Sequence, residues 1–199
     1  MAETLPPILP IEENKEIEEN KEDKKAYEKE NEVLRLIKEK FPAMNTDTAS
    51  ICKRRIYLLV ESDIFLQVIQ FAAQELGFFR LCTITGIDNL DSFEFLYHIA
   101  NTDGILLTLK LKTPRNDDVV IASVLPIYNG ATFYERELEG LLGIKVEGLP
   151  AGRQYPLPDN WPRGQYPLRK DWTPNQNTDK IQENDIDINV RKDEGNGRG

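Results

Sequence analysis

Two short runs of charged residues are the places where this sequence could do chemistry. The first is the triplet Glu135-Arg136-Glu137, and the second is Arg169-Lys170-Asp171. A pair of carboxylates can act as general acid and base in a hydrolase, and an arginine can bind a carboxylate through two parallel hydrogen bonds. On a helix, however, residues two apart point about 200° away from each other. The triplet therefore predicts one carboxylate facing the domain and one facing a partner, which argues against a shared catalytic pocket.

The cysteines and the histidine restrict the chemistry further. Cys52 and Cys82 are the only cysteines of the sequence, and His98 is the only histidine. A structural zinc site needs about four Cys or His ligands, and an iron–sulfur cluster needs about four thiolates. We interpret the cysteines as small packing residues and His98 as a structural residue of a strand. We therefore expect no metal site bound by this chain alone.

Composition places the chain in the class of single-domain proteins with polar tails. It has 199 residues, a net charge of -9 and 40% hydrophobic residues. The acidic balance disfavours a nucleic-acid-binding protein. No apolar run approaches 18 residues, so no transmembrane helix is predicted, and the first residues lack the features of a secretory signal.

Much of the acidity lies at the start of the chain. Residues 1–31 carry ten acidic and five basic residues, and the sequence IEENKE occurs at 11–16 and again at 17–22. Such a segment cannot bury a core, so we expect 1–31 to be an acidic, low-complexity disordered tail. The polar residues 175–199 are expected to form a second disordered tail. An alternative is a stand-alone interaction module whose acidic N-terminal tail recruits a basic partner.

Between the tails, residues 32–148 show the periodicities of an α+β domain. Asp103-Gly104 predicts a hairpin turn between two strands of alternating polarity. We expect a small antiparallel or mixed sheet with helices on one face. The predicted helices cover 32–41, 64–76 (with Ser62 as N-cap), 117–125 and 130–143, and the predicted strands cover 56–60, 78–85, 93–100 and 105–111.

Residues 149–174 form a different kind of segment, in which prolines alternate with aromatic residues. Six of the 12 prolines lie here, which blocks helices and predicts an extended chain. Ordering such a segment costs roughly 1–2 kcal/mol per residue. A small domain offers only part of the apolar surface needed to offset that cost. We therefore hypothesise that the segment wraps over a partner protein.

The motifs in this region carry a family resemblance. They run from Tyr134-Glu135-Arg136-Glu137 through Pro158-Asp159-Asn160-Trp161-Pro162 to Tyr166-Pro167-Leu168-Arg169-Lys170-Asp171-Trp172. Together they resemble the 30 kDa subunit family of respiratory complex I, the C-type subunits of NADH:ubiquinone oxidoreductase. The ending is similar to subunits of energy-converting membrane-bound [NiFe] hydrogenases, formate hydrogenlyases and archaeal dehydrogenases that oxidise a reduced deazaflavin. The family pattern has Asp where this chain has Gly140 and His where it has Leu149.

The resemblance implies a scaffold subunit without a cofactor, in the cytoplasmic arm of a membrane-anchored electron-transfer complex. Such a subunit docks onto the large subunit, which lines the quinone pocket or bears the Ni–Fe site, beside iron–sulfur subunits. It would lie on the cytoplasmic side of the membrane, attached only through the complex, with no catalytic residues of its own. The residues expected at the partner interface are Tyr134, Glu135, Arg136, Glu137, Arg153, Trp161, Tyr166, Pro167, Leu168, Arg169, Lys170, Asp171 and Trp172. A small hydrolase using Glu135 and Glu137 remains the other alternative.

Overall fold

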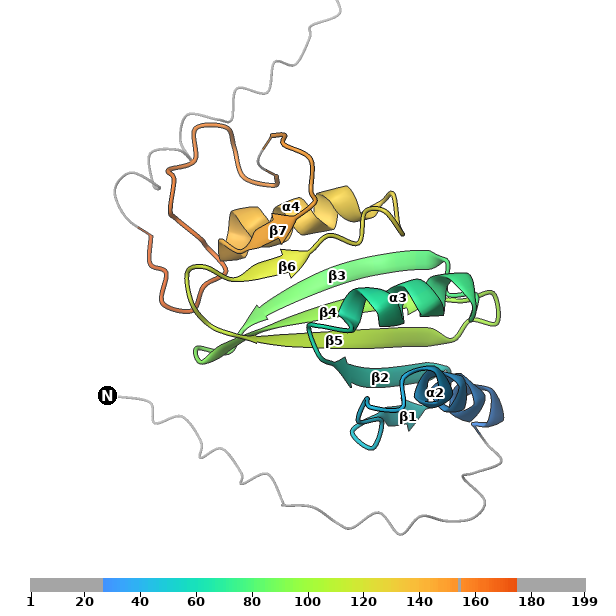
Figure 1. Cartoon of the computed structure of the whole chain (residues 1–199). Coiled ribbons are helices and arrows are strands. Elements are labelled where there is room, and N and C mark those ends of the chain that lie inside the picture. Colours follow the sequence, from blue (N-terminus) through green and yellow to red (C-terminus); the bar gives the residue numbers. More distant parts are fainter. Residues whose placement is uncertain (1–26, 154, 175–199) are drawn as a thin grey trace, which may run out of the picture.

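The computed structural model describes residues 27–153 and 155–174, and both predicted tails lie almost entirely outside these ranges. Within them, the chain forms a five-stranded mixed sheet, a two-stranded sheet and three helices (Figure 1). The predicted α+β class with a mixed sheet is confirmed. In chain order the elements are α2 (Glu28–Lys40), β1 (Ser50–Cys52), β2 (Arg55–Val60), α3 (Phe65–Gln74), β3 (Arg80–Asp88), β4 (Ser92–Ala100), β5 (Leu106–Pro114), β6 (Val120–Ala122), α4 (Ala131–Leu142) and β7 (Lys145–Glu147).

The main sheet is built around the predicted hairpin. Its strand order is β1-β2-β5-β4-β3, in which β2 runs parallel to β5 and the other neighbours are antiparallel. The strands β4 and β5 pair along their whole length, from Ser92 opposite Pro114 to Ala100 opposite Leu106. Strand alternation then fixes which side chains share a face.

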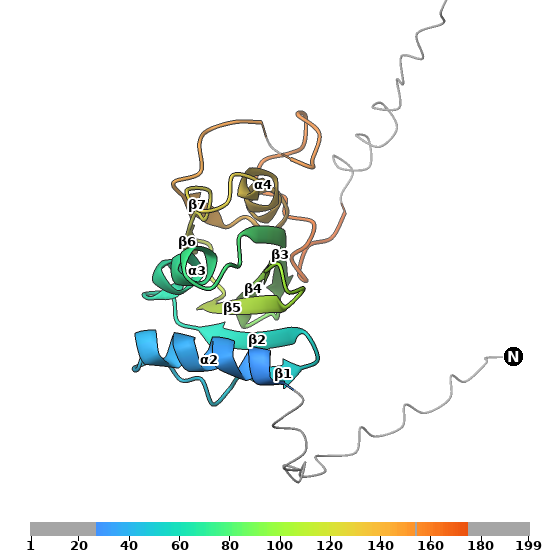
Figure 2. The same cartoon turned by 90° about the vertical axis from the view of Figure 1, so that its right-hand side faces the viewer.

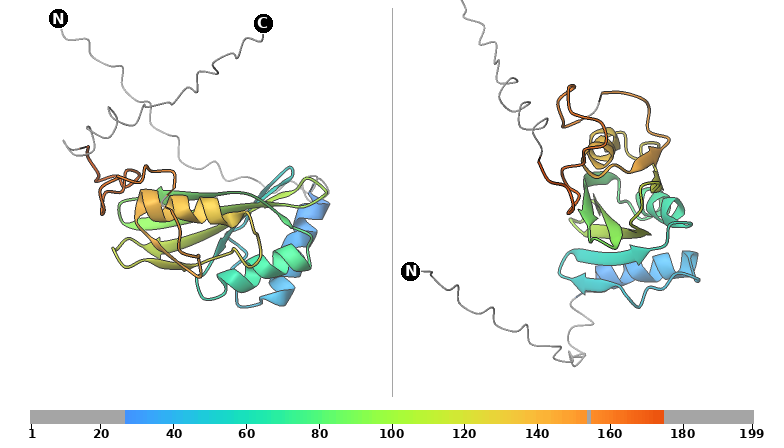
Figure 3. Two further views of the ribbon diagram at one scale, coloured as in Figure 1. Left: turned by 90° about the horizontal axis from the view of Figure 1, so that it is seen from above. Right: turned by 90° about the vertical axis from the view of Figure 1, so that its left-hand side faces the viewer.

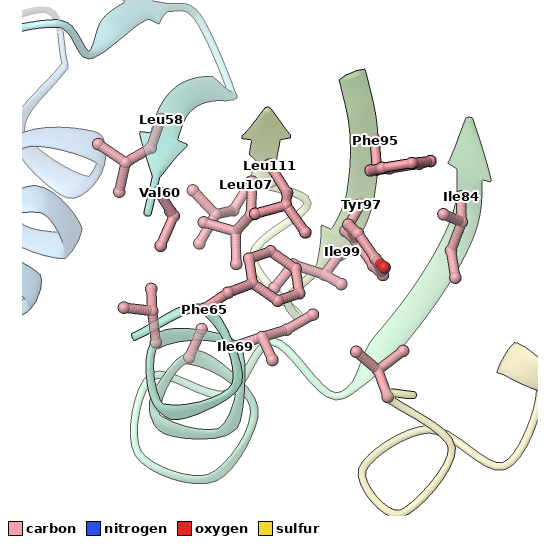
Figure 4. Packing of buried hydrophobic residues seen from close by; sticks show 14 of the residues in the cluster. Leu58, Val60, Phe65, Ile69, Ile84, Phe95, Tyr97, Ile99, Leu107 and Leu111 are labelled. Atoms are coloured by element: carbon pink, nitrogen blue, oxygen red, sulfur yellow. The ribbon is translucent and has the colours of Figure 1, made fainter. Parts of the chain in front are cut away.

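One face of the sheet forms the core. Its rows consist of the inward residues of β2, β5 and β4, and α3 lies across them (Figure 4). Phe65 of α3 contacts Tyr97 of β4, with 4.6 Å between the ring centroids. The largest fully buried side chains are Tyr97, Phe78, Phe93, Phe95, Ile37, Ile56, Leu58, Ile69, Ile99, Leu107, Leu109 and Leu142.

The other two helices extend the same core at its sides. Val33 and Ile37 of α2 are buried in it, and α2 lies beside β1 and β2 (Figure 2). Helix α4 packs along β3, where Leu138 and Leu142 lie over Gly86 so closely that a β-carbon there would overlap both side chains. Figure 3 shows α3 on one side of the sheet and the C-terminal segment above the end of β3.

Three local predictions were wrong. Residues 117–125 form no helix, because the β-branched residues Val119–Ile121 favour a strand, and β6 pairs in parallel with β7. Ser62 does not cap α3, which begins at Phe65 with Ile64 as its N-cap. Cys52 and Cys82 are exposed instead of packed in the core.

Membrane-spanning helices and metal sites are both absent from the described residues. None of the helices in 27–153 or 155–174 is long and apolar enough to cross a bilayer. Within the same ranges, no group of three His, Cys, Asp or Glu side chains is arranged to hold a metal ion.

Two buried tyrosines make a matched test of the core. The Tyr97 hydroxyl has no hydrogen-bond partner in the described ranges, whereas the Tyr128 hydroxyl donates to the Phe78 carbonyl over 2.6 Å. We predict that Tyr97→Phe leaves the free energy of unfolding unchanged or raises it by up to about 1 kcal/mol. Tyr128→Phe should lower it by about 1–2 kcal/mol, because the Phe78 carbonyl loses its partner. Urea unfolding measures both values, and equal losses would contradict this description of the core.

Candidate partner interface

The C-terminal segment, residues 155–174, folds back onto its own domain. It contains no helix or strand, yet its backbone is tied to the end of α4 and the end of β3. The Leu168 N–H donates to the Leu141 carbonyl over 3.0 Å, and the Lys170 N–H donates to Asp88 Oδ2 over 3.0 Å. The segment that we predicted to wrap over a partner is therefore held in place by its own domain.

Asp88 is the centre of these contacts. It ends β3 on the core side of the sheet, and its side chain has no exposed surface. Its two oxygens accept from the N–H groups of Leu90 (2.8 Å) and Lys170 (3.0 Å) and from Nε of Arg115 (3.0 and 3.1 Å). Burial alone would raise the pKa of Asp88, but these hydrogen bonds outweigh burial and lower the pKa below its ordinary value.

The two neighbouring arginines link this carboxylate to the segment. Arg115 also donates to Asp171 over 2.6 Å, and this bond lowers the pKa of the Asp171 carboxyl. Arg169 donates Nε to the Leu142 carbonyl over 2.7 Å, which satisfies one of the last carbonyls of α4. Its guanidinium also pairs with Asp117 over 2.7 Å. The motif Arg169-Lys170-Asp171 therefore uses all three residues to hold the segment.

Arg169 also lies between two aromatic rings. Its guanidinium carbon is 4.7 Å from the centroid of Tyr166 and 5.6 Å from that of Phe93. The Tyr166 ring packs directly on Gly143, the left-handed residue (φ 71°) that ends α4. A β-carbon at Gly143 would overlap the ring, so a glycine here serves both the helix end and the packing of the segment.

Glu135 is a second buried carboxylate, on the inner side of α4. It is fully buried and accepts from Ser123 Oγ over 2.6 Å and from the Val124 N–H over 2.7 Å. Burial raises the pKa of Glu135 above its ordinary value, although both donors oppose that shift. The carboxylate thereby anchors α4 to the loop after β6 and is closed off from solvent.

The rest of the triplet faces outward. Arg136 donates to the carbonyls of Pro150 (2.9 Å) and Arg153 (3.2 Å), which ties the chain just before the C-terminal segment to α4. Glu137 is half-buried and has no polar side-chain partner in the described part of the chain. The Tyr134 hydroxyl donates to the Cys82 carbonyl over 3.0 Å. The spacing argument thus holds for Glu135, while a partner for Glu137 stays a prediction.

The two tryptophans organise the segment itself. Both indole N–H groups donate to Gln165: Trp161 to its carbonyl over 2.8 Å and Trp172 to its side chain over 2.9 Å. Their ring centroids are 6.2 Å apart. The tight fold of the segment leaves Leu168 53% exposed and Lys170 exposed, beside a half-buried Pro167.

At the start of the segment, next to α4, apolar rings also remain at the surface. Tyr155, 44% exposed, contacts Phe133 of α4, which is 63% exposed. Arg153 pairs with Asp159 over 2.6 Å, and both side chains are well exposed. An open hollow of about 590 Å³ lies next to Tyr166, between Asp117, Arg169 and Trp172. The surface of the segment therefore combines exposed apolar side chains with charged ones.

The residues that hold the predicted motif in place carry little local signal in the sequence. The pattern around Asp88 indicates a turn residue, and nothing near Arg115 or Ser123 marks them as partners of the motif. A signal exists for Asp88, because it follows Ile84 and Gly86 on the inward row of β3. A carboxylate at an inward strand position requires a cation or several N–H donors nearby.

The Asp88 cluster makes a stability prediction. Asp88→Asn should lower the free energy of unfolding by about 2–4 kcal/mol, because Arg115 and the Lys170 N–H lose a charged acceptor in a buried place. Asp91→Asn, at an exposed position of the same turn, is the matched control and should cost much less. Urea unfolding measures stability, and limited proteolysis should show faster cleavage within 155–174 for Asp88→Asn only.

The same cluster sets a pH dependence. Since the folded-state pKa of Asp88 is lowered, its stabilising contribution is present above the unfolded pKa of about 3.9 and is lost as pH falls through the lower folded value. The difference in unfolding free energy between the wild type and Asp88→Asn should therefore shrink below about pH 4. A difference that stayed constant to about pH 2 would show that the charge of Asp88 does not carry the effect.

Glu135 and Glu137 form another matched pair. Glu135→Ala should lower the free energy of unfolding by about 2–4 kcal/mol, because the buried Val124 N–H and Ser123 hydroxyl lose their acceptor. Glu137→Ala should change it by less than about 0.5 kcal/mol. Thermal and urea unfolding measure both values, and similar losses would contradict the assignment of Glu135 as the inner residue.

Comparisons with known proteins identify the family of the chain. The family model of the respiratory-chain NADH dehydrogenase 30 kDa subunit matches residues 58–178. The C-type subunit of the F(420)H(2) dehydrogenase of Methanosarcina mazei is 36% identical over 136 residues, covering 67% of this chain and 85% of that protein. The corresponding subunit of the NADH-quinone oxidoreductase of Geobacter sulfurreducens is 31% identical over 144 residues, covering 68% and 85%.

A solved structure extends the comparison to the fold. One chain in the structure of the membrane-bound sulfane sulfur reductase, an archaeal respiratory membrane complex, superposes with a TM-score of 0.67 at 26% identity. The match covers 83% of this chain and 98% of that chain. By sequence and by fold, the chain belongs to the family of the 30 kDa subunit of the respiratory-chain NADH dehydrogenase.

Proposed function

We propose that this chain is a docking subunit, without a redox centre of its own, of a complex I-like membrane complex. Its relatives include subunits of dehydrogenases, a quinone oxidoreductase and a respiratory sulfur reductase, which differ in the electron donor or acceptor they are named for. A subunit shared by such different reactions fits a structural role better than a catalytic one. We place it on the cytoplasmic side, attached to the membrane through its partners.

The observation that carries the proposal is how the motif residues are used. Four charged residues hold residues 155–174 against the domain through their hydrogen bonds: Asp88, Arg115, Arg169 and Asp171. A segment fixed in advance loses less conformational entropy when it binds, so weak contacts give a stable interface. The pinned segment presents Leu168 and Lys170 outward.

The proposed partner of this surface is the large catalytic subunit, next to the iron–sulfur subunits. Exposed apolar side chains, here Leu168, Tyr155 and Phe133, are typical of the centre of a protein interface. The half-buried Glu137 fits a charged pair across it. A hydrolase using Glu135 has no support, since that carboxylate is enclosed by its own donors.

The test is the recovery of partners from host membranes that express variants of this chain. Leu168→Asp should abolish co-purification of the large subunit after gentle detergent extraction, because it puts a charge at the centre of the proposed interface. Leu66→Asp is the matched control: Leu66 is 37% exposed, lies on the first turn of α3, and should retain the partners.

The two variants must first be shown to fold. Neither should change the free energy of unfolding by more than about 1 kcal/mol, since both side chains are exposed. Retention of the large subunit by a folded Leu168→Asp variant would contradict the proposed interface. Loss of the partners by Leu66→Asp alone would move the interface to α3.

A further inference from the structure

The main sheet has a second face, opposite the core, which no helix of the described residues covers (Figure 3). Its outward row on β2 consists of Arg55, Tyr57 and Leu59, all exposed. Tyr57 is 38% exposed and Leu59 is 41% exposed. A hollow of about 330 Å³ lies beside these two side chains and Lys110. Apolar side chains are thus exposed to solvent on this face.

This face is basic, in a chain whose net charge is -9. By strand alternation and register, it carries Arg55, Arg80, Lys110 and Lys112. Glu94 is the one carboxylate among the strand residues described on this face, and it pairs with Lys110 over 3.1 Å. We call the four basic residues, with Tyr57 and Leu59, the basic face.

His98 lies on this face near Arg55. It lies on the outward row of β4, with Nδ1 2.9 Å from the Thr108 hydroxyl oxygen. Burial lowers the pKa of His98, and the nearby charge of Arg55 lowers it further. Arg55 and His98 lie on the same face, because Arg55 is opposite Leu106 and His98 is opposite Thr108.

The chain enters the described part next to this face. Lys29, in the first turn of α2, pairs with Asp103 in the β4–β5 turn over 3.0 Å. Glu30 accepts from the Arg54 N–H over 2.7 Å, in the turn just before β2. Both contacts place the start of α2 at the end of the sheet where Arg55 begins the basic face.

The residues that precede α2 have the complementary charge. Residues 11–23 contain seven acidic and two basic residues, with Ile11 and Ile17 among them. Only residues 24–26 separate them from Tyr27. The basic face lies within their reach, because the nine-residue strands of the sheet span only about 30 Å. We propose that residues 11–23 dock on the basic face of the same chain. The short connection gives an effective concentration of the order of millimolar, so a weak contact is enough to occupy the face.

The proposal is independent of the docking role of residues 155–174, which lie at the end of β3 and along α4. A separate acidic protein or a second copy of the chain would have to bind without the help of the tether. Because exposed charges are screened over about 8–10 Å, the contact should weaken strongly in salt.

The experiment places a spin label at position 17 of the full-length chain, with Ile17→Cys and with Cys52 and Cys82 replaced by serine. In NMR spectra at low salt, the amide signals of Tyr57 and Leu59 should fall to less than about half of their intensity relative to the reduced label. The signals should recover in about 0.5 M NaCl, where charges are screened over a few ångströms. The charge reversal Arg55→Glu with Lys112→Glu should abolish the effect.

The control reverses two exposed charges elsewhere, Lys145→Glu with Arg163→Glu, and should leave the broadening unchanged. Urea unfolding first establishes that both double variants fold. Unchanged signals in the basic face of the labelled chain would overturn the proposal. So would broadening that appears only when labelled chain is mixed with isotope-labelled chain, since that contact would be between copies.

Discussion

The described C-terminal structure depends on the hydrogen bonds that the buried carboxylate of Asp88 accepts. This charge is buried at the end of a core strand, so it needs hydrogen-bond donors. Arg115 and the backbone N–H of Lys170 supply them. Through these contacts the end of β3, the chain after β5 and the last described residues become one unit. Arg169 adds the end of α4 to the same unit. Asp88, Arg115, Arg169 and Asp171, whose types could suggest an active site, therefore hold the chain's own backbone in place. We call these four residues the clamp.

The charged residues of this cluster bond to one another and to the backbone of their own chain. A clamp that is closed within one chain does not depend on which electron donor the complex uses. These contacts fix an outer surface on which Leu168 and Lys170 are exposed. We propose that a partner binds there at a low cost in conformational entropy. The proposed interface follows from the rigidity of the segment and not from any reactive group.

The sequence predicts the local elements better than the long-range contacts. Alternating side chains identify β4 and β5, and the Asp103-Gly104 turn joins them, because both signals lie within a few residues. The helix predicted at 117–125 is wrong, since the partner of β6 is a strand more than 20 residues away and no local pattern announces it. For the same reason no local pattern indicates the partners of Asp88, since Arg115 and Lys170 are 27 and 82 residues away.

The surface held out by this clamp is the one we expect to contact the large catalytic subunit. The most direct test is a photo-crosslinking amino acid at position 168 of the full-length chain, activated in host membranes before gentle extraction. We predict one main crosslinked product containing the large subunit, and none from a probe at position 66. Crosslinks from position 168 that stay within the chain or reach only unrelated proteins would contradict the proposed docking role.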